Sequence, residues 1–389
     1  MTLKNRIVRS ATYEGACDAE GYPGISYSRI YKTLAMNEVG MIITGFAFVS
    51  KAGRAMQTRQ AGIDKPEKIE YFKKVTDEIH KYGCRIVMQI AHTGRQTLEK
   101  ITNSAPLSST TKPSLYFRQK PRLITEEETE EIIGQFAESA YLAKEAGFDG
   151  VQLHAAHGYL LHQFLLPETN ILKNRFGIDK KTGLGTALPG EVFDAVKARC
   201  GDSFPVLVKI SGDHNLPGNF FPDKFDNLIR FLNEKRFDAI EISYGTMDYA
   251  LNIFRGDINL DKVFTYNPMF RTDSKLMKTV SGLCLKKLII SRFIKFAPAY
   301  NLRYAERAKK LTDIPVISVG GFRNKNEIES AIKNNSADLI ALSRPFICEP
   351  DLAKKFMEAP GDYESQCKNC NDCVFMCDSG RVTTCYSKK

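Results

Sequence analysis

Residues 147–159, GFDGVQLHAAHGY, are the segment from which the fold of this chain can be read outward. A short apolar strand at 151–153 is followed directly by two histidines, His154 and His157, and then by Tyr159. A strand that ends in titratable side chains is typical of a parallel barrel with its active site at the carboxyl ends of the strands. Neutral imidazoles can donate hydrogen bonds to a carbonyl oxygen, and a tyrosine can deliver a proton. Taken alone, the segment is equally compatible with a metal-binding pair or with two core histidines.

The rest of the chain repeats this pattern. Short β-rich runs alternate with longer amphipathic runs, which predicts βα units and a parallel sheet. Parallel strands are buried on both faces, so each should be a continuous apolar run, and eight strands close a barrel. We therefore expect an α/β fold, a (βα)8 TIM barrel. The expected strands are 6–10, 40–44, 85–90, 150–153, 206–210, 239–242, 316–319 and 339–342.

Helix signals support this alternation. Thr125 and Glu128 have the spacing of a capping box, and Gly147 is placed to end that helix in a left-handed conformation. Weaker signals predict helices over 67–82 and 324–335.

Two regions depart from this alternation of strands and helices. Residues 97–124 are rich in Pro, Ser and Thr and are interpreted as a long loop. Residues 245–300 form an insertion, in which 281–296 is apolar and basic. We expect this stretch to form a helix over the top of the barrel, with a membrane-surface helix as the alternative.

The composition is that of a globular protein. The chain has 389 residues, of which 43% are hydrophobic and 26% charged. No apolar run reaches the ~18 residues of a membrane span, and the first residues do not form a signal peptide, so we expect a cytoplasmic protein without an integral membrane segment. The net charge of +10 is scattered and lacks an aromatic–basic platform, which argues against a nucleic-acid partner.

The expected strand ends carry a set of polar groups that fits one cofactor. Lys209 lies inside an apolar strand, where an amine is costly unless it meets an anion or an electron-rich ring. Gly321 and Arg344 follow the last two strands, where barrels of this type bind phosphate. Flavin mononucleotide (FMN) would place its phosphate there, with Gln89 at the pyrimidine edge and Lys209 stabilising the reduced ring. The candidate FMN-binding residues are Ser10, Ala11, Thr12, Tyr13, Gly45, Phe46, Gln89, Lys209, Gly320, Gly321, Ser343 and Arg344.

The same segments resemble the Old Yellow Enzyme family of FMN-dependent NAD(P)H oxidoreductases, or ene-reductases. The resemblance implies hydride transfer from NAD(P)H to FMN, and from FMN to the C=C bond of an α,β-unsaturated carbonyl compound. It also implies that His154 and His157 hold the carbonyl oxygen of that acceptor and that Tyr159 donates a proton. The matching motifs are LKNRIVRSAT (3–12), GMIITG (40–45), MQIAHTGR (88–95), HAAHGYL (154–160) and ADLIALSRP (337–345).

One segment departs from the family pattern. After its histidines the family usually has Asn-x-Arg-x-Asp-x-Tyr-Gly-Gly-Ser, whereas residues 170–179 read NILKNRFGID, and only Asn170 and Gly177 match. The departure puts the local loop and the contacts of a homo-oligomer in doubt.

A cysteine-rich tail, 361–389, follows the expected barrel of residues 1–360. Cys367, Cys370, Cys373 and Cys385 have the spacing of a metal site, with Cys377 as a spare thiol. The tail resembles the [4Fe–4S] segment of 2,4-dienoyl-CoA reductases and trimethylamine dehydrogenase, which implies electron supply from NAD(P)H or from a ferredoxin-like carrier. A structural Zn2+ and a tail without metal are the alternatives.

Two further functions compete with an ene-reductase. An amine dehydrogenase is suggested by the likeness of the tail to trimethylamine dehydrogenase, but the histidine pair argues against it, because an aromatic cage would be expected for a cationic amine. The other is a non-catalytic flavoprotein that exchanges electrons through the tail.

Overall fold

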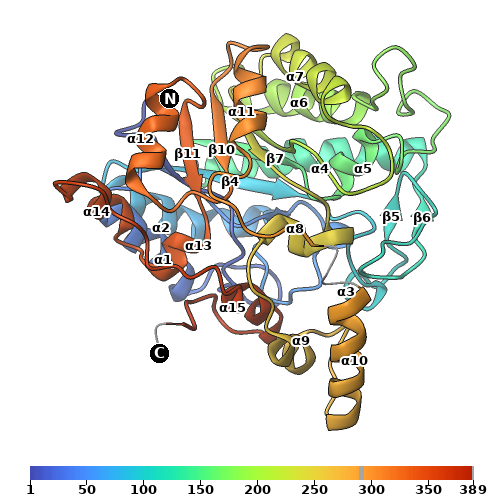
Figure 1. Cartoon of the computed structure of the whole chain (residues 1–389). Helices are drawn as coiled ribbons and strands as arrows, with labels where there is room; N and C mark the ends of the chain where they lie inside the picture. Colours follow the sequence, from blue (N-terminus) through green and yellow to red (C-terminus); the bar gives the residue numbers. More distant parts are fainter. Residues whose placement is uncertain (289–292, 388–389) are drawn as a thin grey trace.

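Eight parallel strands form a closed barrel, surrounded by helices, in the computed structural model, which describes residues 1–288 and 293–387 (Figure 1). Each strand pairs in parallel with its neighbours, and the β2–β4 pairing completes the ring. All eight predicted strands are confirmed, with ends within two residues. They are β1 (Ile7–Arg9), β2 (Met41–Ile43), β4 (Arg85–Ala91), β7 (Gly150–Ala155), β8 (Val206–Ser211), β9 (Ala239–Ser243), β10 (Val316–Val319) and β11 (Leu339–Leu342).

The register of three neighbouring strands brings polar residues to one level of the barrel. His154 of β7 pairs with Lys209 of β8, which in turn pairs with Glu241 of β9. Apolar side chains fill most of the remaining interior, as expected for strands buried on both faces. Its buried side chains are Val8, Met41, Ile43, Val87, Leu207, Ala239, Ile317, Val319 and Ala341.

The outer helices cover the barrel. They include α1 (Ile25–Met36), α2 (Ile69–His80), α4 (Glu126–Glu145), α6 (Ala187–Cys200), α7 (Asp223–Lys235), α11 (Leu302–Lys309), α12 (Lys325–Lys333) and α14 (Leu352–Glu358). The capping box at the start of α4 is confirmed: the Thr125 hydroxyl accepts from the Glu128 N–H at 3.2 Å, and the Glu128 carboxylate accepts from the Thr125 N–H at 3.0 Å. Gly147 has the expected positive φ, +83°.

The prediction of a long loop over 97–124 is partly wrong. This segment contains α3 (Glu99–Thr102) and a two-stranded sheet of β5 (Leu107–Ser108) and β6 (Arg122–Leu123). Strands of two residues have no periodicity that could reveal them in the sequence. β3 (Ala47–Phe48), which extends the barrel sheet beside β4, was missed for the same reason.

The insertion differs from its prediction in where its helices lie. It contains α8 (Ala250–Phe254), α9 (Leu260–Tyr266) and α10 (Lys275–Leu288), so the expected helix over 281–296 begins earlier and does not include 293–296. Residues 289–292 of that prediction lie outside the described residues. α8 and α9 contribute side chains to the barrel mouth, whereas α10 projects away from the body (Figure 1).

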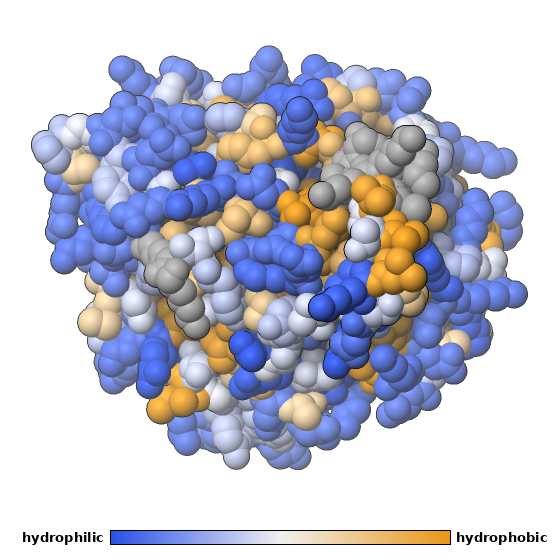
Figure 2. Space-filling view, turned by 60° about the horizontal axis from the view of Figure 1, so that its bottom comes forward, coloured by the Kyte–Doolittle hydropathy of each residue, from blue (hydrophilic) through white to orange (hydrophobic). Residues whose placement is uncertain are grey.

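α10 carries apolar side chains into solvent. The exposed fractions of Leu276, Met277, Val280 and Leu283 range from 52% to 75%. Hydrophobic residues gather on the face of the molecule that carries this insertion (Figure 2). Among the described residues, no helix combines the length and apolar character that crossing a bilayer requires.

The tail folds back onto the barrel mouth. After α13 (Arg344–Cys348), the buried Glu349 carboxylate accepts hydrogen bonds from the Tyr363 hydroxyl, the Ser365 hydroxyl and the Gln366 N–H at 2.6–2.7 Å. Farther on, α15 (Asp372–Phe375) packs against α9.

Candidate active site

One cavity, of about 320 Å³, lies at the carboxyl ends of the barrel strands. It brings together most of the residues that the sequence singled out. These are Ala11, Thr12, Tyr13, Phe46, Gln89, His154, His157, Tyr159, Lys209, Gly320, Gly321, Ser343 and Arg344. The other two predicted residues, Ser10 and Gly45, lie behind its wall. The Ser10 hydroxyl donates to Glu241, and the Gly45 N–H donates to the Glu14 carboxylate at 2.6 Å.

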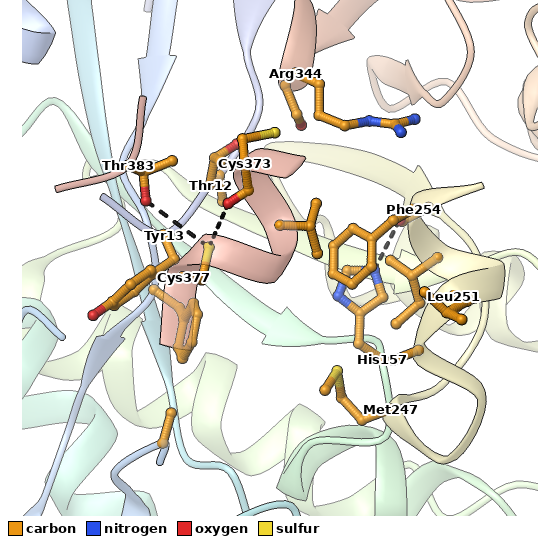
Figure 3. A pocket seen from close by; sticks show the side chains of 18 of the residues that line it. Thr12, Tyr13, His157, Met247, Leu251, Phe254, Arg344, Cys373, Cys377 and Thr383 are labelled. Carbon is orange, nitrogen blue, oxygen red and sulfur yellow. Dashed lines mark hydrogen bonds between the residues drawn. The ribbon is translucent and has the colours of Figure 1, made fainter. Parts of the chain in front are cut away.

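His154, His157 and Tyr159 form a compact group at the end of β7. The His154 ring centroid lies 5.0 Å from that of His157 and 4.7 Å from that of Tyr159. His157 faces the apolar side chains of Met247, Leu251 and Phe254 from the insertion (Figure 3). Among the described residues, no group of three or more His, Cys, Asp or Glu side chains could hold a metal ion, so the pair does not belong to such a group.

Both histidines are held as neutral donors. Burial, with the nearby Lys209 charge, holds the pKa of both rings well below the ordinary value of 6.5. His154 Nδ1 accepts from the Ala156 N–H at 3.4 Å, so the proton of the neutral ring sits on Nε2. His157 Nε2 lies 2.8 Å from the Ser243 hydroxyl. When that hydroxyl donates to Nε2, the ring proton of His157 sits on Nδ1.

The backbone around His157 is unusual and locally secured. His157 has φ +60°, which non-glycine residues rarely adopt. Its N–H donates to the Ser211 hydroxyl at 3.2 Å, and its carbonyl accepts from the Met247 N–H at 2.8 Å. Met247, at the start of the insertion, therefore stabilises the backbone turn at His157.

Tyr159 is a buried phenol next to these rings. Its ring centroid lies 5.5 Å from that of Phe46, and burial raises the pKa of its hydroxyl above the ordinary value of 10. A phenol with a raised pKa stays protonated at neutral pH, so Tyr159 is held in the form that can donate a proton.

Lys209 forms an ion pair with a buried carboxylate. Its ammonium lies 3.1 Å from Glu241 Oε1 and donates to the Ser10 hydroxyl at 2.9 Å. Sequence reasoning missed Glu241, although a charged residue within the apolar run of β9 is the same signal that identified Lys209.

The end of the cavity at which the FMN phosphate is expected has groups that can bind a phosphate. Gly320 and Gly321 have φ of +133° and +88°, so they form a turn that favours glycine, and their backbone lines the cavity without side chains. Arg344 Nη1 donates to the Arg255 carbonyl at 3.0 Å and to the Asn371 side-chain oxygen. Both bonds use Nη1, which leaves the other guanidinium nitrogens available to an anion.

The tail supplies a wall of the cavity that the sequence did not predict. Cys373 and Cys377 lie on the tail side of the cavity with Thr383 (Figure 3). The tail also contributes Asp378, whose carboxylate accepts from Gln57 Nε2 at 2.8 Å and from Asn267 Nδ2 at 2.7 Å. Burial raises the pKa of Asp378 to about 6. The cysteine spacing marked Cys373 as a candidate metal ligand, but no local pattern marks Asp378 or Thr383 as cavity residues, because contacts between distant segments place them.

A second, smaller cavity is lined by the four predicted cluster thiols, Cys367, Cys370, Cys373 and Cys385. Cys373 lines both cavities, whereas Cys377 lines only the larger one of the two. The finding that no described group of three or more His, Cys, Asp or Glu side chains could hold a metal ion includes these four thiols.

Comparison with known proteins agrees with this architecture. A family model for the NADH:flavin oxidoreductase / NADH oxidase family matches residues 1–248 and 291–360, and the gap coincides with α8–α10. An NADH oxidase of Thermoanaerobacter brockii is 27% identical over 98% of this chain and 52% of its own length. A cinnamate reductase of Clostridium sporogenes is 27% identical over 96% of this chain and 53% of its own length. The chain thus spans about half the length of these curated relatives.

A solved structure extends the likeness at the level of the fold. The complex of 2-naphthoyl-CoA reductase with 2-naphthoyl-CoA matches with a TM-score of 0.82 and 21% identity. The match covers 98% of this chain and 54% of that one.

Proposed function

The chain belongs to the NADH:flavin oxidoreductase / NADH oxidase family, and from this premise we propose that it is an FMN-dependent ene-reductase. It would transfer a hydride from NAD(P)H to the C=C bond of an α,β-unsaturated carbonyl compound. The observation that carries this proposal is the cavity lined by His154, His157 and Tyr159 together with Lys209 and Arg344. The family match also confirms the resemblance drawn from the sequence motifs.

The residues around the cavity fit FMN. Arg344 and the glycine turn suit a phosphate, Gln89 presents an amide, and Lys209 presents a cation from the barrel floor. FMN, when bound, supplies the hydride acceptor and donor of the reaction. The proposed FMN-binding set is the one expected from the sequence, with Ser10 and Gly45 supporting the wall from behind.

The protein's own groups would then act on the acceptor. The neutral N–H donors of His154 and His157 would bind its carbonyl oxygen and stabilise the negative charge that develops there. Tyr159 would deliver a proton to the α-carbon. The surrounding apolar side chains would exclude water, which strengthens these hydrogen bonds.

The cavity favours an acceptor with a bulky apolar or aromatic part. Its walls include Phe46, Phe117, Phe254, Phe270 and Met247, and two cationic side chains that line it, Lys209 and Arg344, are assigned to the flavin. The cinnamate reductase among the relatives, whose substrate carries an aromatic ring, supports this preference.

Anaerobic assay of the FMN-loaded protein tests the proposal. We expect NAD(P)H consumption with cinnamaldehyde or cyclohexenone, and formation of the saturated carbonyl product by mass spectrometry. The saturated aldehyde is the matched control and should give no turnover. Bound flavin with no reduction of any enone or enal would overturn the proposal. Reduction of the oxidised, bound flavin by trimethylamine in the absence of NAD(P)H would favour the amine dehydrogenase.

We further propose that the tail binds a [4Fe–4S] cluster through Cys367, Cys370, Cys373 and Cys385. These thiols line one cavity, and their spacing in the sequence is that of an iron–sulfur site. Because Cys373 lines both cavities, a cluster there would lie next to the flavin site. It would let a ferredoxin-like carrier supply electrons in addition to NAD(P)H.

Metal analysis of anaerobically purified protein checks the cluster. We expect about four irons per chain, with Cys373→Ser lowering iron to well below half of that content. Cys377→Ser is the matched control, because Cys377 lies only four residues away but does not line the thiol cavity. Zinc without iron, or equal iron loss in both variants, would contradict this ligand set.

A further inference from the structure

A buried polar network lies behind the floor of the cavity. Glu241 and Gln152 are fully buried, and Ser10, Gln89 and Lys209 are at most 3% exposed. Glu241 is at the centre, because it bonds to three of the other four members. Gln89 and Lys209 line the cavity, whereas Glu241, Gln152 and Ser10 do not.

One side of the network holds Lys209. Glu241 Oε1 accepts from the Ser10 hydroxyl at 2.5 Å and lies 3.1 Å from Lys209 Nζ. Lys209 also donates to the Ser10 oxygen at 2.9 Å, so the three groups form a closed triangle. The carboxylate therefore fixes the position of the ammonium and neutralises its charge at the cavity floor.

The other side of the network orients Gln89. A carboxylate can only accept hydrogen bonds, so Gln152 must present its NH2 group to Glu241 Oε2, 2.7 Å away. The oxygen of Gln152 then faces Gln89, whose own NH2 group donates to it at 2.7 Å. The side-chain oxygen of Gln89 remains as the acceptor available to a molecule in the cavity.

We propose that Glu241 is a positioning residue that fixes the direction of the hydrogen bonds in this network, from Lys209 at one end to the acceptor oxygen of Gln89 at the other. The inference rests on the proposed binding of FMN. A flavin ring carries a pyrimidine N–H that an acceptor at Gln89 would bind. Lys209 would favour the reduced, more negative flavin less strongly than an uncompensated cation, because Glu241 opposes its charge.

Two variants separate the two sides of the network. Glu241→Gln removes the negative charge and replaces a carboxylate, which can only accept hydrogen bonds, with an amide that can also donate them. Because the charge of Lys209 is then no longer opposed, we expect the bound flavin's midpoint potential to rise, with a shift of about tenfold in the oxidised-to-reduced ratio. That shift corresponds to about 30 mV for two electrons. We also expect FMN to bind about 3- to 10-fold more weakly, because Gln89 no longer has one fixed orientation. Gln152→Leu cuts only the Gln89 side and should weaken FMN binding similarly while leaving the potential unchanged.

The matched control is Asp226→Asn, which removes a buried carboxylate that pairs with Arg307 on the outside of the barrel. It should change neither quantity. A wild-type potential in Glu241→Gln together with wild-type FMN affinity in Gln152→Leu would overturn the inference. If Glu241→Gln does not fold, Gln152→Leu alone decides, since unchanged affinity there contradicts the proposed orientation of Gln89. Failure of the wild-type chain to bind FMN would instead overturn the proposed function.

Discussion

Replacement of His157 by alanine is expected to lower kcat/KM for an unsaturated carbonyl substrate by about 10²- to 10³-fold. The reason is the loss of one of two N–H donors aimed at the oxygen where negative charge develops, an interaction of oxyanion-hole type. His157 is well fixed for this task, with its ring nitrogen 2.8 Å from the Ser243 hydroxyl and its carbonyl bonded to the Met247 N–H. Stopped-flow reoxidation of photoreduced enzyme by the enone measures the effect directly.

The same experiment contains its controls. Reoxidation by molecular oxygen needs no carbonyl donor and should keep its wild-type rate in the His157 variant. His80→Ala is the matched histidine replacement, because His80 pairs with Asp149 away from the cavity. If His157→Ala reduced the enone as fast as the wild type, the pair would not hold the carbonyl oxygen.

The acid limb of the pH profile provides a further check on these rings. Burial keeps the pKa of His154 and of His157 well below 6.5, so both rings stay neutral as the pH falls through that value. We therefore expect no loss of enone reduction near pH 6.5 from these two groups. A fall in rate with a midpoint near 6.5, absent from the His157 variant, would contradict their assignment as neutral donors.

Replacement of Tyr159 by phenylalanine is expected to lower the rate of enone reduction by about 10²- to 10⁴-fold, the range typical of a lost general acid. The variant keeps the ring that packs against Phe46 and His154 and removes only the hydroxyl. FMN content should stay close to wild type. A normal rate in this variant would mean that the proton comes from solvent or from another group.

Tyr116→Phe is the matched control for the tyrosine. Tyr116 also lines the cavity, but its hydroxyl accepts from Asn267 Nδ2 at 2.6 Å and is thus part of the wall. Its loss should change the rate of the proton-transfer step much less than the loss of the Tyr159 hydroxyl. Equal losses in the two variants would indicate a general change in the pocket.

The barrel and most of the candidate site could be predicted from the sequence because both depend on local patterns. A parallel strand buried on two faces must be a continuous apolar run, and a titratable residue at its end must have a use. This logic located His154 and His157, and it located Lys209 as a cation in need of an anion or an electron-rich ring. It would have located Glu241 too, since the acid interrupts the apolar run of β9 in the same way.

The rest depended on contacts that no local pattern encodes. The tail reaches the cavity because the Thr383 N–H bonds to the Glu14 carbonyl at 2.7 Å and Asn371 bonds to Arg344, pairings between segments far apart in sequence. The helix positions in the insertion were misjudged because apolar and basic residues continue past the end of α10. Hydrophobic composition alone does not show where such a helix begins.

The position of the tail has a consequence for the modularity of the protein. Among the described tail residues, six form part of the cavity wall: Cys373, Val374, Phe375, Cys377, Asp378 and Thr383. A recombinant chain cut after residue 360 would have a pocket open on that side, and Arg344 would lose its Asn371 partner. The cysteine segment therefore cannot be exchanged independently of the barrel. Grafting this tail onto another barrel of the family would also require the transfer of the insertion 245–300.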